Sequence, residues 1–191
     1  MSTSKQWRSN DQGWSAVSQT LHWLIALLVI GLCAAGLIMT ELPTSPTKIK
    51  IYALHKSIGI TVLALMLIRL GWRLFDRRPA YPASMPGWQK QLAALTHGLL
   101  YLLLFVMPLS GWLYNSASNF PLRYFGLFSL PALTGPSPEL KSLAHEVHEW
   151  GFYVLASLLL IHVAAALKHQ LQGDDTLQRM LPWRKQEDTG T

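Results

Sequence analysis

The stretch HEVHEWGFYVLASLLLIHVAAALKH, residues 145–169, is apolar enough to cross a lipid bilayer, yet it contains four histidines. His148 and His162 are 14 residues apart, which is about 21 Å along a helix at about 1.5 Å per residue. This separation is nearly four turns, so both imidazoles leave the same face of the helix. One helix therefore offers one ligand near each side of a bilayer with a hydrocarbon core about 30 Å thick.

The overall composition is that of a membrane protein. Half of the 191 residues are hydrophobic and 14% are charged, against about 25% charged in an average soluble domain. The formal charge of +6 comes from clusters at particular loops, which favours membrane orientation and argues against nucleic-acid binding. With one cysteine, Cys33, the chain has no internal disulfide and no C-x-x-C-H motif, so any haem would be held by coordination and packing alone.

Four long apolar runs predict an all-α integral membrane fold, a single domain over residues 1–191 with four transmembrane helices in a bundle. The helices are expected at about 18–40, 51–75, 92–114 and 142–170, between polar N- and C-terminal tails. A signal peptide is the alternative for the first run, but its apolar part would be about 7–15 residues long. The aromatic connection 115–141 is expected to lie on the membrane surface or to cap a pocket.

The distribution of positive charge predicts the orientation. Eleven of the 16 Lys and Arg residues lie on the side that holds both termini, and five lie on the other side. By the positive-inside rule both termini are therefore cytoplasmic. Following the chain through four spans then places His22 and His162 toward the cytoplasm, and His55 and His148 toward the outer side.

Two level pairs of histidines favour two haem groups in the bundle core. Two imidazoles that face one another across a helix bundle are the axial ligands that a six-coordinate haem b requires. Zinc or copper would need three or four ligands at one point, with carboxylate or sulfur nearby. For one histidine taken alone, an interfacial or hydrogen-bonded role is the simpler explanation. Ionisable residues inside a membrane are costly, however, and usually serve a function.

The other histidines have less defined roles. His97 lies at the depth of the cytoplasmic pair, where it either contacts a haem propionate or a quinone or fills the interior. His145, one turn before His148, is the alternative outer ligand. His169 lies near the headgroups, where solvation is the expected role.

Basic side chains near the predicted haem sites are candidates for binding propionates. Arg69 and Arg73 are four residues apart at the cytoplasmic end, and arginine forks suit carboxylates. The alternative for both arginines is that they only flank the cytoplasmic end of a membrane helix, as the positive-inside rule describes. Lys56, beside His55, either plays the same part at the outer haem or attracts an anion. The aromatic segment 123–128 either roofs the outer haem or anchors the chain at the interface.

Short motifs stand in order along nearly the whole chain: TLHW at His22, LHKSIG at His55, THGLLYLLL at His97, MPLSG from Met107, IHVAAALKH from Ile161 and DDTLQRM from Asp174. Together they resemble the bacterial cytochrome b561 family of four-helix dihaem membrane proteins. The resemblance implies two non-covalent haems b ligated by His22, His55, His148 and His162. It also implies residence in the bacterial inner membrane.

The same resemblance implies electron transfer between a quinone pool and a redox partner. The first hypothesis is an oxidoreductase that couples superoxide oxidation to ubiquinone reduction through the two haems. The second is a non-enzymatic electron relay or membrane-anchor subunit of a larger redox complex. The expected partners are lipid, a quinone, and either superoxide or a redox protein. No side chain is assigned a catalytic role in bond chemistry.

Overall fold

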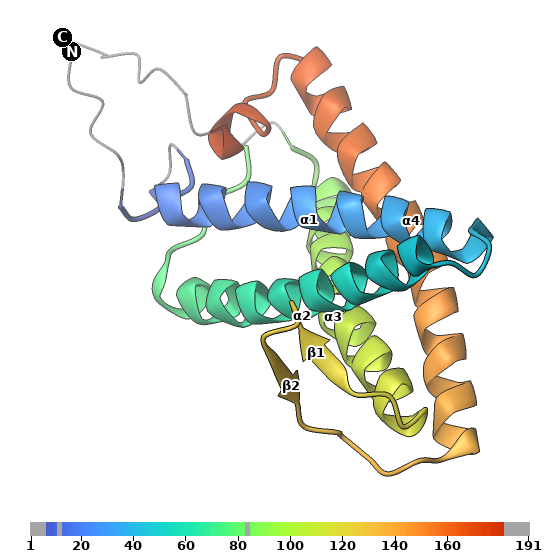
Figure 1. The fold of residues 1–191 in the computed structure, drawn as a ribbon. Coiled ribbons are helices and arrows are strands. Elements are labelled where there is room, and N and C mark those ends of the chain that lie inside the picture. Colours follow the sequence, from blue (N-terminus) through green and yellow to red (C-terminus); the bar gives the residue numbers. More distant parts are fainter. Residues whose placement is uncertain (1–6, 11–12, 83–84, 182–191) are drawn as a thin grey trace, which may run out of the picture.

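The computed structural model describes residues 7–10, 13–82 and 85–181 of the chain. Four long helices dominate it: α1 (Ala16–Glu41), α2 (Pro46–Phe75), α3 (Gly87–Ala117) and α4 (Pro138–Leu171). Each is long and apolar enough to cross a membrane, which confirms the predicted four-helix membrane architecture. In Figure 1, α1 and α2 run side by side, and α3 and α4 form a second pair that crosses them in this view.

All four helices begin earlier than the apolar runs predicted, α1 by two residues and the other three by four or five. Both α2 and α4 begin at a proline, and the serine before each accepts a hydrogen bond from the first turn: Ser45 caps α2 and Ser137 caps α4. A proline is tolerated in the first turn because an N–H at that position would have no partner within the helix. The third helix, α3, begins at Gly87, five residues before the predicted start at about residue 92.

The four helices meet in a small core, and most of their apolar surface faces outward. The buried core side chains come from every helix: Ile25, Val29, Val62, Met66, Leu100 and Leu155. Many other large apolar side chains are exposed, among them Leu27, Leu67, Leu102 and Leu160. An exposed apolar surface of this extent on all four helices is what contact with lipid requires.

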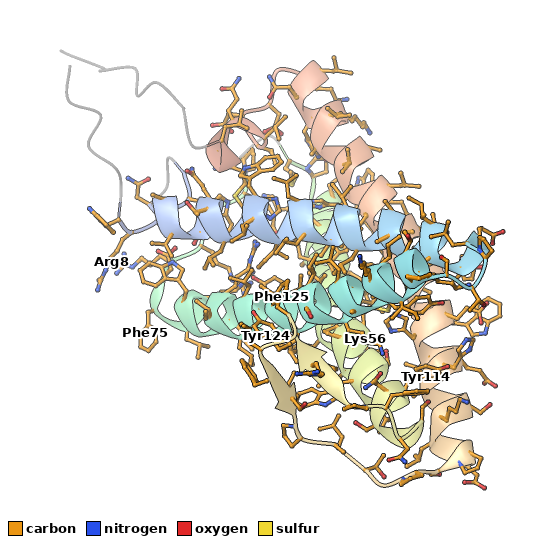
Figure 2. All side chains as sticks on the ribbon, viewed as in Figure 1. Arg8, Lys56, Phe75, Tyr114, Tyr124 and Phe125 are labelled. Carbon is orange, nitrogen blue, oxygen red and sulfur yellow. The ribbon has the colours of Figure 1, made fainter. Side chains whose placement is uncertain are left out.

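The connection between α3 and α4 contains a β-hairpin that was not predicted from the sequence. Its strands are β1 (Leu122–Tyr124) and β2 (Phe128–Leu130), which pair antiparallel. The turn between them needs a residue with positive φ at Gly126. The backbone N–H of Phe125 donates to the hydroxyl of Ser57 at 2.9 Å, and Figure 2 shows Phe125 against α2. The hairpin is thus tied to α2 two residues from His55.

The described part of the N-terminal tail is packed rather than free, because a single carboxylate holds it. The carboxylate belongs to Asp76, the residue that ends α2. Its oxygens accept hydrogen bonds from Ser9 (N–H and Oγ), Ser15 Oγ, Ser18 Oγ and Trp72 Nε1. Burial alone would raise the pKa of Asp76, but the serine hydrogen bonds outweigh it and lower the pKa to about 2. An ionised Asp76 therefore joins the start of α1 to the end of α2.

The segment after α4 also packs on the bundle, against α1. It forms a short 3₁₀ helix, η1 (Gln178–Met180). The N–H of Trp14 donates to the Arg179 carbonyl at 3.3 Å, and the indole N–H of Trp23 donates to the Met180 carbonyl at 2.8 Å. The predicted polar tail is therefore an ordered part of this end as far as residue 181. Three residues used in the charge count lie outside the described residues: Lys5, Arg184 and Lys185.

Candidate functional site

Helix α4 carries His148 and His162, and each of their imidazoles faces an imidazole from another helix. The ring centres of His22 and His162 are 6.2 Å apart, and those of His55 and His148 are 6.3 Å apart. We name His22 and His162 the terminal pair, because they lie where α1 begins and α4 ends. We name His55 and His148 the loop pair, because they lie toward the connection that carries the hairpin. The structure thus brings four histidines together two by two, while their role as ligands stays a prediction.

The spacing within each pair fits one metal ion between two imidazoles. Bonds from a metal to an imidazole nitrogen are about 2 Å long, so two rings on opposite sides of one ion have centres about 6 Å apart. Glycines leave room at the loop pair. A Cβ added at Gly36 would lie 3.7 Å from His55 Cε1, and one added at Gly111 would lie 3.3 Å from His148 Cε1. The donor set and the space around it therefore suit a bis-histidine haem.

In the loop pair, the backbone of α3 fixes the orientation of His148. The Nδ1 atom of His148 lies 3.0 Å from the carbonyl oxygen of Met107 and 3.0 Å from the hydroxyl of Ser110. A carbonyl can only accept, so Nδ1 carries the hydrogen and donates it. This leaves the Nε2 lone pair free for a metal, which is the usual arrangement behind a ligating histidine.

The second ring of the loop pair, His55, has an unsatisfied nitrogen. Its Nδ1 atom is buried and has no hydrogen-bond partner in the part of the chain that the structure describes. A buried polar atom without a partner is costly and marks a place where function rather than stability sets the structure. The neighbouring Lys56 is half-buried, and its ammonium donates to the Asn115 amide oxygen at 2.6 Å. The structure therefore places Lys56 beside the loop pair, with its charge directed to α3.

In the terminal pair, a guanidinium group contacts the histidine of α1. Arg69 Nη1 lies 3.2 Å from His22 Nδ1, which places the guanidinium group against this ring. Arg69 and Arg73 both donate to the hydroxyl of Tyr101 on α3. The structure thus gathers both predicted arginines at the terminal pair, where they could meet the carboxylates of a haem.

His97 also belongs to this end of the bundle. Its ring centre is 5.3 Å from that of His162, nearer than the ring of His22. The Nδ1 atom of His97 donates to the carbonyl of Ala93 at 2.6 Å, one turn earlier in α3. Among the described residues no group of three or more His, Cys, Asp or Glu is arranged to hold a metal ion.

His145 lies apart from the loop pair. Its side chain is 60% exposed, and its Nδ1 atom is 3.7 Å from the carboxylate of Glu149, one turn along α4. It lines an open surface hollow of about 400 Å³, together with Tyr114 and Lys141. This hollow lies at the start of α4 and does not include the paired histidines. The histidine of the HEVH motif that faces His55 is thus His148.

The expected solvation of His169 is wrong. Its side chain is only 17% exposed, and its Nδ1 atom is 3.0 Å from the carboxylate of Asp174. The chain turns back after α4, which brings a residue five positions later against the ring. Burial opposes ionisation of Asp174, but hydrogen bonds from Thr176 and His169 outweigh it and lower the pKa of Asp174. His169 therefore fastens the end of α4 and does not face solvent.

Several side chains around the two pairs were missed from the sequence. Met107 and Ser110 contact His148 directly, while Tyr101, Asn115 and Asp76 contact Arg69, Lys56 and Ser15. For some of these residues the sequence contained a usable pattern. Tyr101 follows His97 by four residues, so both lie on one face of α3. Met107 and Ser110 belong to the quoted MPLSG motif. No local pattern pointed to Asp76, because its serine partners lie more than 50 positions away.

Comparisons with known proteins identify the family of this chain. A family model described as prokaryotic cytochrome b561 matches residues 13–183. The chain is similar to two Escherichia coli K12 proteins, cytochrome b561 homolog 2 (35% identity, 91% of this chain and 93% of the relative) and homolog 1 (33% identity, 86% and 94%). It is also similar to a protein named probable superoxide oxidase CybB from Yersinia pestis (27% identity, 90% and 97%). The chain belongs to the prokaryotic cytochrome b561 family and is a membrane b-type cytochrome of electron transport.

Proposed function

We propose that this protein binds two haem b groups, one at the terminal pair and one at the loop pair, and carries electrons between them. The observation that supports this most directly is the position of α4. It gives one histidine to each of two facing pairs, whose ring centres are 6.2 and 6.3 Å apart. Since the two histidines are about 21 Å apart along the helix, the two sites lie at different depths of the membrane.

A bound haem supplies one-electron chemistry, between ferric and ferrous iron. The protein residues hold and tune that group. At each pair the two histidines would hold the haem iron, and a haem held in this way would exchange electrons without binding oxygen. The Met107 carbonyl keeps His148 in the tautomer whose Nε2 lone pair is free. Arg69 and Arg73 offer positive charge to the propionate carboxylates.

The proposed reaction takes electrons from superoxide at the loop pair and delivers them to ubiquinone. Two superoxide anions each give up one electron and leave as molecular oxygen. One ubiquinone accepts both electrons and two protons and becomes ubiquinol. Basic residues toward the loop end would attract the anion: Lys48, Lys50, Lys56 and Arg123. The similarity to a protein named as a superoxide oxidase supports this choice of donor over a redox protein.

We also propose that the protein lies in the bacterial inner membrane with both termini in the cytoplasm. Eleven of the 16 Lys and Arg residues lie on the side of the termini, as the positive-inside rule requires. In this orientation the loop pair is near the outer surface, where the hairpin connection lies. A cysteine placed near either terminus should then react with a membrane-impermeant thiol reagent only in inverted vesicles.

Rapid mixing of the oxidised, purified protein with superoxide tests the proposed reaction. The reduced b-type spectrum should appear within the mixing time and disappear when ubiquinone is added. Superoxide dismutase in the same mixture should abolish the reduction. If dithionite reduces the haem and superoxide does not, superoxide is not the donor. The relay hypothesis then applies, and a redox subunit should co-purify with the chain.

A further inference from the structure

The hydroxyl of Tyr101 lies between two guanidinium groups. Its oxygen accepts hydrogen bonds from Arg69 Nε at 3.0 Å and from Arg73 Nη1 at 3.1 Å. The two guanidinium carbons are also 5.7 and 5.0 Å from the centre of the Tyr101 ring, within the range of cation–π attraction. One tyrosine on α3 thus holds two cations of α2 in one place.

These two cations have no protein anion as a partner. In the described part of the chain, no carboxylate oxygen lies within 4.0 Å of either guanidinium group. Asp76 lines the same small hollow of about 20 Å³ as Arg69, Arg73 and Tyr101. Its oxygens, however, are already occupied by the serine and tryptophan donors. Asp76 brings negative charge to this hollow but pairs with neither guanidinium group, so the two adjacent positive charges favour an anionic ligand between them.

The group is directed toward the terminal pair. Arg69 uses Nε for Tyr101 and Nη1 for His22, so one guanidinium connects the tyrosine to a ring of that pair. The oxygen of Tyr101 already accepts two hydrogen bonds, and its own hydrogen has no acceptor among the described residues. Three donor groups, two of them charged, therefore meet beside His22. Such a set matches a carboxylate, which accepts several hydrogen bonds at once.

We infer that Tyr101 is a positioning residue of the terminal site, whose hydroxyl fixes Arg69 and Arg73 as a doubly cationic clamp for one haem carboxylate. This rests on the proposed binding of two haems. The clamp has a measurable consequence, because positive charge near an iron stabilises its reduced form and raises its midpoint potential. The contacts of His148 in the loop pair are a carbonyl and a hydroxyl, which are neutral. The clamp therefore raises the potential of the terminal haem above the value it would have without the two arginines held in place.

Replacement of Tyr101 by phenylalanine tests the inference, with redox titration of the visible spectrum as the readout. Tyr101→Phe keeps the ring and removes the shared acceptor, so the two guanidinium groups repel and separate. In the titration each haem gives one reduction wave, here called the terminal wave and the loop wave. The midpoint potential of the terminal wave should fall by at least about 28 mV, which corresponds to a threefold change in the ratio of reduced to oxidised haem at 59 mV per tenfold change. The loop wave should stay in place. Loss of one wave in His162→Ala identifies the terminal haem.

The matched control is Tyr114→Phe, which removes a phenol hydroxyl near the other end of α3, where the ring contacts His145. It should move neither wave. Arg73→Gln provides a second test should Tyr101→Phe fold poorly, because it removes one cation of the clamp and should also lower the terminal wave. If the folded variants bind two haems and the terminal wave does not move, the role of Tyr101 is overturned while the proposal of two haems stands. A wild-type chain with fewer than two haems would overturn the proposed function and this inference with it.

Discussion

The terminal pair and the loop pair present the same two side chains, yet their surroundings differ in charge. At the terminal pair, Arg69 Nη1 lies 3.2 Å from His22 Nδ1, and Arg73 lies close through its contact with Tyr101. At the loop pair, His148 Nδ1 donates to a backbone carbonyl and to the hydroxyl of Ser110. The nearby cation, Lys56, is bound to an amide oxygen.

This difference shows how one helix can serve two redox sites with different properties. Each site would use two histidines, one of them from α4, so the ligands themselves cannot give the two haems different midpoint potentials. The group that contacts the Nδ1 atom of a histidine, and the charge nearby, can do so, since the outer contacts of a ligating histidine tune the metal. A chain that passes electrons in one direction needs such a difference. The predictions below test it from the largest expected effect to the smallest.

Removal of one histidine of α4 should remove one haem and leave the other. His162→Ala should abolish the terminal haem, and His148→Ala should abolish the loop haem, so that each variant binds half of the wild-type haem. Haem counted per chain from the visible spectrum measures this. His145→Ala is the matched control and should keep both haems, because its side chain is exposed and turned to Glu149. Loss of a haem in His145→Ala but not in His148→Ala would reverse the assignment.

A side chain at Gly111 should weaken the loop haem selectively. A Cβ at this position already lies 3.3 Å from His148 Cε1, and the methyl groups of Gly111→Val need more room. Overpacking costs about 1–3 kcal/mol, so haem affinity at the loop pair should fall on the order of tenfold. Gly98→Val in the same helix is the control, because a Cβ there meets nothing within 4 Å. Equal haem retention by the two variants on dilution would argue against close packing of His148.

Loss of the Asp76 charge should destabilise the terminal end first. Asp76→Asn removes charge-assisted hydrogen bonds that are typically stabilising by about 1.5–3 kcal/mol. On heating, the variant should release the terminal haem at a lower temperature than the loop haem. Glu41→Gln, an exposed carboxylate at the other end of α1, should leave the order of release unchanged. Simultaneous release of both haems from Asp76→Asn would contradict a local role.

The pH dependence of the same variant gives a second measure of this effect. The pKa of Asp76 is about 2 in the folded protein, below the usual value of about 3.9 for an aspartate. Its contribution to stability is therefore fully present above about pH 4 and is lost as the pH falls toward 2. Thermal unfolding of wild type and Asp76→Asn should accordingly differ most above pH 4 and converge in stronger acid. A difference that stays constant down to pH 2 would mean that another group is responsible.

The smallest expected effect is on the approach of an anionic donor. Lys56→Gln removes one positive charge beside the loop pair and keeps a donor for Asn115. Reduction by superoxide should slow by a few-fold at low salt, and the difference should shrink as salt screens the charge. Stopped-flow rates at two ionic strengths measure this. The two potentials and the haem content should stay close to those of wild type, and a rate independent of salt would exclude steering by Lys56.

The architecture could be predicted from the sequence because apolar runs and histidine spacing are local patterns. The 14-residue interval on α4 predicted both imidazoles on one face, and the structure sets each against a ring of another helix. The hairpin was missed because its strands are three residues long and depend on Ser57 of α2. The roles of Tyr101 and Asp76 could not be predicted because each contacts groups distant in sequence, which only the packed helices bring together.

Haem counted per chain during a redox titration of the purified protein tests the central claim most directly. Two separate sites that share α4 predict two b haems per chain, reduced in two one-electron waves of equal amplitude. His162→Ala and His148→Ala should each remove a different wave. One haem per chain, or loss of the same wave in both variants, would contradict two sites built on one helix.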